Sequence, residues 1–378
     1  MSDSNLQRPT RAEISLDNLS FNFQSVKKFV GENLQYMAVV KADAYGHCAA
    51  ECAARLESDG VDCFGVALPE EGLELRKKNI KKPVICLGGF WSGQENLLLE
   101  NDLIPVVYRL EMAEMLARAA KNKNITAAVH IKIDTGMGRI GVRFDEAEMF
   151  AEEFKKFKNL NVQGLMTHFA AADDLSENEF TDIQIDKFNR AVKIFEEKGF
   201  RPIYKDLANS PGAVAHKTGR GNMVRLGGVL YGLGGDVLPA EIEKPVLKPV
   251  MSLYSRIAHI KKVPKGETLG YNRAFQTVRD SLIATVPIGY HDGFRRFLSN
   301  RGQFIINQKY APVVGKISMD WTIADVTDVP NVKVEDEVVI IGRQGDLEIK
   351  AEQLAQLGNT ISYEITCGIG SRVPRFFK

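Results

Sequence analysis

Short apolar runs alternate with helical patterns from residue 37 to residue 226, and this alternation limits the fold more than any other feature of the chain. The runs are typical of buried strands, because each is short, apolar and bounded by turn-forming residues. They span residues 37–40, 61–66, 83–87, 103–107, 126–133, 162–166, 203–207 and 223–226. Between them, apolar residues at helical spacing predict helices over 70–78, 111–121, 145–157 and 180–198. Eight strands in such an alternation favour a (β/α)8 barrel over an open doubly wound sheet.

An additional helix is expected before the first of these strands. Leu19, Phe23, Val26 and Val30 recur at helical spacing, and Asp17 is the expected N-cap. A different pattern begins after residue 231, where Gly234-Gly235 and the proline-containing stretch 239–249 are typical of a linker.

Short apolar runs separated by turn residues predict a second domain. These runs span residues 253–260, 282–288, 312–314, 323–326 and 338–341, with a short helix over 351–357. They indicate a mainly antiparallel β domain. We therefore expect the barrel to occupy residues 13–240 and the β domain residues 241–378, with residues 1–12 as a candidate addition to the β domain.

The composition argues against several classes of function. A formal net charge of +1 gives no support for binding to nucleic acid or to an acidic membrane. No apolar run approaches membrane-spanning length, and the polar residues 1–9 show no apolar core of a secretory signal. The five cysteines have no metal-ligand spacing, so we expect reduced thiols, no metal site and a cytoplasmic location.

Chemically useful residues stand where the predicted strands end. They are Lys41, Gly88-Gly89, Tyr108, Asp134, His168, Asn209-Ser210 and Arg225. On a closed barrel all of these ends meet at one mouth, which is where such barrels carry their active sites. Lys41 follows the first strand, and burial of a lysine at that position would lower its pKa and make it nucleophilic.

The loops after the seventh and eighth predicted strands are candidates for a phosphate site. Ser210 offers a hydroxyl there, and Gly227 lets backbone amides approach an anion, although each loop alone is more often a plain tight turn. Together with Lys41 they suggest pyridoxal phosphate bound through a Schiff base. If Arg225 faced the pyridine nitrogen, it would donate a hydrogen bond without giving up its proton, because the pKa of arginine is above about 12. A surface or interface arginine is the alternative.

The remaining candidates lie in loops. The glycines of residues 132–141 permit a tight loop that aims Arg139 into the mouth, where it could hold a carboxylate or the cofactor phenolate. This loop matches neither the P-loop nor the dinucleotide fingerprint. His168 alone is more often a structural histidine, and Tyr271 and Tyr290 alone are more often packing residues.

Taken together, these motifs resemble alanine racemase. They occupy, in the expected order, residues 39–47, 134–139, 167–169, 209–210, 289–293, 318–320 and 372–375, and the resemblance extends from about residue 15 to the C-terminus. It implies a pyridoxal-phosphate barrel and a β domain in a head-to-tail homodimer. It also implies interconversion of L-alanine and D-alanine by two-base proton transfer at Cα of the cofactor aldimine, supplying D-alanine for peptidoglycan synthesis.

The resemblance implies a role for each matching residue. Lys41 would be the Schiff-base lysine and one base, and Tyr271, reaching in from the partner subunit, the other. Tyr45, Ser210, Gly227 and Tyr363 would hold the cofactor phosphate and Arg225 its pyridine nitrogen, and Arg139, His168 and Asn209 would be further cofactor-binding residues. The substrate carboxylate would meet Arg139 and the backbone of Met319, with His168 tuning Tyr271. Tyr290 and Asp320 would line the entrance, and Lys132 matches a lysine that several members carbamylate and that orients the neighbouring arginine.

Other enzymes and carriers fit the residues less well. Gly370-Ser371 stands where some members carry Ser-Tyr, which leaves open a broad-specificity racemase acting on serine or basic amino acids. A decarboxylase of the same architecture would place a carboxylate, not Arg225, at the pyridine nitrogen. A non-catalytic pyridoxal-phosphate carrier would resemble the barrel alone and would not need Tyr271 or Met319-Asp320.

Overall fold

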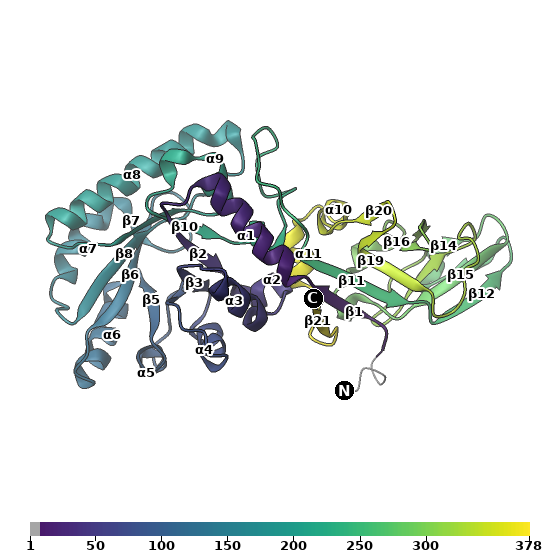
Figure 1. The fold of residues 1–378 in the computed structure, drawn as a ribbon, viewed down its shortest axis with the longest axis horizontal. Helices are drawn as coiled ribbons and strands as arrows, with labels where there is room; N and C mark the ends of the chain where they lie inside the picture. The colour runs from purple at the N-terminus through teal and green to yellow at the C-terminus, as the bar shows by residue number, and fades with distance from the viewer. Residues whose placement is uncertain (1–7) are drawn as a thin grey trace. The chain divides into compact units, whose positions relative to one another are not determined.

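The computed structural model describes residues 8–378 and divides them into two compact units (Figure 1). The barrel unit comprises residues 19–230 and 237–247, and the β unit comprises residues 8–18, 231–236 and 248–378. Residues 1–7, which belong to the segment expected to add to the β domain and to the polar start of the chain, lie outside the described residues. The predicted domain boundary between residues 240 and 241 stays a prediction.

The barrel unit contains a closed ring of eight parallel strands. They are β2 (Gln35–Val39), β3 (Cys63–Val66), β4 (Val84–Cys86), β5 (Leu103–Val107), β6 (Ala127–Asp134), β8 (Leu160–Met166), β9 (Tyr204–Ala208) and β10 (Met223–Leu226). Each pairs in parallel with the next, and β10 pairs back onto β2. A two-residue strand, β7 (Val142–Arg143), adds to β6. The predicted (β/α)8 barrel is confirmed.

The helices of this unit lie outside the ring of strands (Figure 1). They are α1 (Leu16–Val30), α3 (Ala49–Ser58), α4 (Pro69–Lys77), α5 (Glu95–Glu100), α6 (Leu110–Asn122), α7 (Ala147–Phe154), α8 (Asn178–Glu197) and α9 (Ser210–Ala215). The predicted stripe Leu19, Phe23, Val26 and Val30 is buried, as expected for an amphipathic helix. The predicted cap was wrong, because the Ser15 Oγ accepts the backbone N–H of Asn18 at 3.1 Å and Asp17 lies inside the first turn.

Apolar side chains fill the interior of the barrel. They come from six of its strands, namely Met37, Cys63, Ile85, Ile104, Val106, Met166 and Met223. His130 is also fully buried and stacks on Tyr204, with 5.7 Å between the ring centroids. A Cβ at Gly164 would lie 2.6 Å from the His130 ring, so the glycine makes room for the imidazole. The interior is therefore a packed core, and function must lie at its rim.

The β unit is mainly antiparallel, as predicted. Its larger sheet has the strand order β17-β16-β19-β11-β1-β21 with β20 paired to β19, and β12, β15 and β18 form a second sheet. The strands are β1 (Arg11–Ile14), β11 (Met251–Arg256), β12 (His259–Val263), β13 (Thr268–Leu269), β14 (Phe275–Gln276), β15 (Ser281–Val286), β16 (Gln303–Ile306), β17 (Lys309–Pro312), β18 (Thr322–Asp325), β19 (Glu337–Gln344), β20 (Leu347–Ile349) and β21 (Arg375–Phe377). The helices are α10 (Ala351–Leu357) and α11 (Ser362–Cys367).

One predicted strand of this unit is two strands. The run 253–260 was expected to be continuous, but Ile257 donates to the carbonyl of Asp336 and Ala258 to that of Thr285. The chain therefore leaves the larger sheet after β11 and enters the second sheet as β12. Across residues 8–378, the helices are too short or too polar to cross a membrane.

Candidate active site

Lys41 begins an unusual turn at the mouth of the barrel. The turn α2 (Lys41–Gly46) follows β2, and Ala42, Asp43, Ala44 and Tyr45 all have φ between 52° and 56°. Left-handed backbone costs about 1–2 kcal/mol per residue for residues other than glycine. Hydrogen bonds hold it in place, from Ala42 N–H to Glu71 Oε1 at 2.8 Å and from Ala49 N–H to Asp43 Oδ1 at 2.7 Å. The surrounding fold thus imposes the conformation of the segment that carries Lys41.

Three of the predicted phosphate ligands meet beside this turn. Ser210 Oγ accepts the backbone N–H of Gly227 at 2.9 Å. A Cβ at Gly227 would lie 2.5 Å from the Tyr45 hydroxyl oxygen, so glycine allows the tyrosine hydroxyl to approach the backbone at this position. Asn209 caps α9 by accepting the N–H of Gly212 at 3.1 Å, which makes it a structural support of Ser210.

Arg225 projects from β10 into a set of acceptors. Its Nη2 donates to the carbonyls of Thr167 at 3.0 Å and Leu207 at 3.1 Å, and lies 3.0 Å from His168 Nδ1. Its Nη1 forms a buried ion pair with Asp206 Oδ1. Burial raises the pKa of Asp206 to about 6, against the attraction of Arg225 and Lys132. The guanidinium is therefore fixed in one orientation by a carboxylate that the sequence analysis did not single out.

His168 is neutral in this environment. Burial lowers its pKa to about 2, and the positive charges of Arg225, Lys132, Arg139 and Lys41 act in the same direction. Because Arg225 donates to Nδ1, the remaining ring proton must sit on Nε2. His168 is therefore a hydrogen-bond donor at its Nε2 and has no proton to give as an acid near neutral pH.

Lys132 lies in the same positive environment. Burial, together with the positive charges of Arg225 and Arg139, lowers its pKa to about 7, although Asp206 acts in the opposite direction. The loop that follows is tight, because Asp134 Oδ1 accepts the N–H groups of Gly136 at 2.9 Å and Gly138 at 3.1 Å. At neutral pH a substantial part of Lys132 is thus an uncharged amine.

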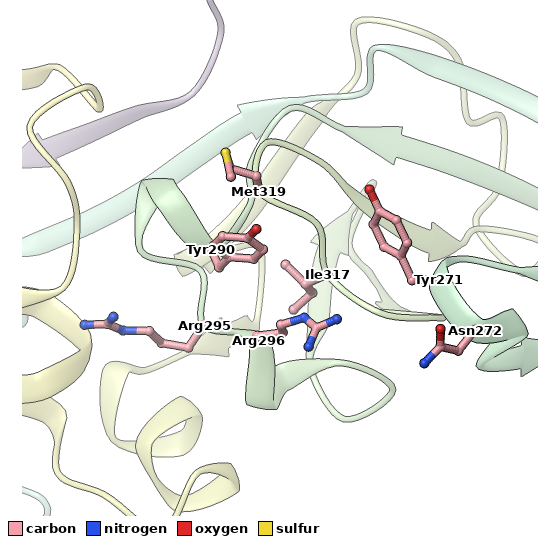
Figure 2. A pocket seen from close by; sticks show the side chains of 7 residues that line it. All are labelled: Tyr271, Asn272, Tyr290, Arg295, Arg296, Ile317 and Met319. Carbon is pink, nitrogen blue, oxygen red and sulfur yellow. The ribbon is translucent and has the colours of Figure 1, made fainter.

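A pocket of about 630 Å³ lies in the β unit (Figure 2). It is lined by Tyr271, Asn272, Tyr290, Arg295, Arg296, Ile317 and Met319. Figure 2 shows that Tyr271 and Tyr290 rise from different loops, with Ile317 between them. Tyr271 is 63% exposed and is followed by Asn272 in the left-handed region with φ of 57°.

The predicted site residues thus fall into two groups. The barrel unit carries Lys41, Tyr45, Lys132, Arg139, His168, Asn209, Ser210, Arg225 and Gly227, and the β unit carries Tyr271, Tyr290, Met319, Asp320 and Tyr363. Asp206 was missed because it lies inside a predicted strand. An acidic residue in an otherwise apolar run was the available signal for it.

The chain matches two families along its length. Residues 14–234 match the family described as "Alanine racemase, N-terminal domain" and residues 250–377 the one described as "Alanine racemase, C-terminal domain". An alanine racemase of Halothermothrix orenii is 44% identical over 375 residues, which covers 99% of this chain and 98% of that protein. An alanine racemase of Geobacter sulfurreducens is 43% identical and covers 98% of this chain and 97% of that protein.

Solved structures agree over the same length. The alanine racemase of Clostridium difficile 630 superimposes with a TM-score of 0.92 at 37% identity, covering 99% of this chain and 96% of that one. The alanine racemase of Bartonella henselae, which has covalently bound pyridoxal phosphate, superimposes with a TM-score of 0.88 at 28% identity, covering 98% of this chain and 99% of that one.

Proposed function

Because the chain belongs to the alanine racemase family, we propose that it is an isomerase that interconverts L-alanine and D-alanine and thereby supplies D-alanine for peptidoglycan synthesis. The observation that carries this proposal is the arrangement at the barrel mouth. Lys41 follows β2, Arg225 lies on the neighbouring strand β10 of the same barrel, and Gly227 comes shortly after Arg225 with the Tyr45 hydroxyl against its backbone. The alternative of a broad-specificity racemase is not favoured, because the matching families and relatives are alanine racemases.

The barrel residues fit pyridoxal phosphate. Gly227 has no Cβ, so the hydroxyls of Tyr45 and Ser210 both lie close to its backbone, where they could donate to a phosphate. Lys41 would hold the cofactor covalently, and Arg225 would donate a hydrogen bond to the ring nitrogen while keeping its own proton. When bound, pyridoxal phosphate supplies an electron-withdrawing ring that makes the Cα proton of the substrate more acidic.

Two side chains would move the proton. Racemisation removes a proton from one face of Cα and returns one to the other, so it needs a base on each face. We assign these roles to Lys41 and to the partner subunit's Tyr271. His168, with its proton on Nε2, is suited to donate a hydrogen bond to the tyrosine oxygen and to stabilise it after it has lost its proton.

Further residues would position the substrate. Arg139 and the backbone of Met319 would bind the carboxylate, and Tyr290 and Asp320 would stand at the entrance. Lys132 is suited to carbamylation, because only an uncharged amine adds carbon dioxide and its pKa is lowered to about 7. A carbamate there would be a negatively charged neighbour for Arg139.

The proposed enzyme is a homodimer in the cytoplasm. The exposure of Tyr271 on the β unit, at 63%, supports completion of each site by a second copy. Tyr363, on α11, is a further proposed ligand of the cofactor phosphate. Neither nucleic acid nor a membrane is a proposed partner.

An assay of the purified protein with a panel of L-amino acids tests the function. We expect kcat/KM to be highest for alanine, and activity to be lost when pyridoxal phosphate is removed and regained when it is returned. A higher kcat/KM for serine or a basic amino acid would favour the broad-specificity alternative. No racemisation of any amino acid by the cofactor-loaded protein would refute the proposal.

A further inference from the structure

A cluster of two arginines and two aspartates lies in the β unit, next to the residues that line the pocket of Figure 2. Arg8 and Arg372 both contact Asp292, and Arg372 also contacts Asp320. The side chain of Asp292 is fully buried, whereas those of Arg372 and Asp320 are 35% and 46% exposed. The cluster therefore extends from the interior of the unit to its surface.

Asp292 is the fixed end of this cluster. Its Oδ1 accepts Arg372 Nε at 2.5 Å and its Oδ2 accepts the N–H of Gly289 at 2.9 Å. Burial raises its pKa, but the hydrogen bonds from Arg372, Gly289 and Arg8 together hold the pKa below its usual value. The backbone carbonyl of Asp292 also accepts the N–H of Gly370 at 3.0 Å. Asp292 is thus an ionised anchor with its orientation set on several sides.

Arg372 joins this anchor to a loop of the pocket. The same guanidinium that contacts Asp292 through Nε donates through Nη2 to Asp320 Oδ1 at 2.6 Å. Asp320 directly follows Met319, whose carbonyl accepts the N–H of His291 at 3.1 Å. A Cβ at Gly289 would lie 2.3 Å from that carbonyl, so the two loops are in close contact. The position of Asp320 is therefore tied to Asp292 through one arginine.

The charge of Asp320 matters for a substrate that carries a carboxylate. Asp320 is next to Met319, which lines the pocket. An unpaired Asp320 carboxylate would repel the carboxylate of the substrate. Arg372 neutralises Asp320 and holds it in one place, while leaving the backbone of Met319 in position. Arginine suits this task because its planar group can contact two carboxylates at once, which a lysine ammonium does less well.

We propose that Arg372 is a positioning residue for substrate binding, which holds Asp320 against the Asp292 anchor so that no free carboxylate faces the incoming substrate. This inference rests on the proposed function, because it takes alanine as the substrate and the Met319 segment as one of its contacts. If this inference is right, replacing Arg372 weakens substrate binding because it leaves the Asp320 carboxylate unpaired. Removing the charge of Asp320 should then repair most of the damage.

The test compares KM and kcat for alanine in the wild type, Arg372→Met, Asp320→Asn and the double variant. Arg372→Met should raise KM about tenfold, by like-charge repulsion, and change kcat less than about threefold. Added salt should lower the KM of Arg372→Met, because salt screens exposed charges. The double variant should return KM to within about threefold of the wild-type value.

A matched control removes another arginine of the same unit. Arg343 on β19 pairs with Glu348 at 2.8 Å, and Arg343→Met should leave KM and kcat unchanged. Should Arg372→Met fail to fold, Arg372→Gln decides by the same comparison, since the amide can still donate to Asp292.

Two results would overturn the inference while the proposed function stands. One is an Arg372 variant with the wild-type KM, and the other is a double variant whose KM is as high as that of the single variant. A wild-type protein that does not racemise alanine would instead overturn the proposed function, and this inference with it.

Discussion

The close approach of the Tyr45 hydroxyl to Gly227 allows a sharp test of the cofactor site. In Gly227→Ala the new Cβ would lie 2.5 Å from the Tyr45 hydroxyl oxygen and 3.2 Å from Cζ of the same ring. Tyr45 is 9% exposed and belongs to the left-handed turn, so its ring has little freedom to move away. We expect overpacking to cost about 1–3 kcal/mol, which for a unit of this size corresponds to a fall in Tm of about 2–10 °C.

The same substitution should weaken the binding of pyridoxal phosphate. Displacing one hydroxyl donor from a charged acceptor costs about 1.5–3 kcal/mol, which raises Kd about 10–150-fold. The measurements are thermal unfolding of the cofactor-free protein and titration of that protein with pyridoxal phosphate, followed by absorbance. Gly235→Ala is the control, because its Cβ would meet only the flexible end of Glu352 at 3.3 Å.

A second variant separates steric crowding from loss of the donor. Gly227→Ala combined with Tyr45→Phe removes the crowded oxygen, so it should regain part of the lost stability but none of the lost affinity. If Gly227→Ala bound pyridoxal phosphate with a Kd within about twofold of the wild-type value, Gly227 would have no part in the phosphate site.

Three further predictions concern the proposed bases and Lys132. Borohydride reduction of the cofactor-loaded protein followed by peptide mapping should place the label on Lys41, and a label on another lysine would contradict its assignment. Mixing inactive Lys41→Ala and Tyr271→Phe proteins under subunit exchange should restore some activity, since one site of a mixed dimer keeps both the lysine and the tyrosine. No recovery despite demonstrated exchange would mean that each chain builds its own site. The pKa of Lys132 is about 7 in the folded chain, whereas the pKa of an unfolded lysine is about 10.4. Between about pH 7 and about pH 10.4, the lysine is therefore protonated in the unfolded chain and uncharged in the folded chain. The contribution of Lys132 to stability should therefore rise as pH increases through this window. Lys132→Met should flatten that rise in the free energy of unfolding, and an unchanged profile would show that Lys132 keeps an ordinary pKa.

Much of the fold could be predicted from the sequence, because apolar periodicity reports burial directly. The strands β5 and β10 and the helix α10 have the predicted bounds, and the ring of eight strands follows from the alternation. The errors arose where long-range contacts decide local structure. The run 253–260 has uniform strand character, but its backbone partners, Asp336 and Thr285, belong to different parts of the β unit.

Site residues that belong to a sequence motif could be predicted. Backbone conformations and residue pairs that depend on tertiary contacts could not. Of Ala42–Tyr45 only Asp43 is of a residue type that tolerates left-handed backbone, and Glu71 on α4 helps to impose this conformation. The pair of Asp292 and Arg372 joins residues 80 positions apart, with no periodic pattern between them. Local propensity carries no information on such contacts.

β1 pairs with β11 and, in parallel, with β21, so the β unit holds a strand from the start of the chain between strands made much later. During synthesis, Arg11–Ile14 leaves the ribosome before either neighbour exists. The residues of the barrel emerge next, so β1 gains its partner β11 only when residues 251–256 have been made and its partner β21 only when residues 375–377 have been made. Until β11 has been made, β1 lacks both of its native partners, and an unpaired strand edge invites pairing with other nascent chains. β1 is therefore open to misassembly while the barrel residues are being synthesised, and one of its two edges stays unpaired until β21 has been made.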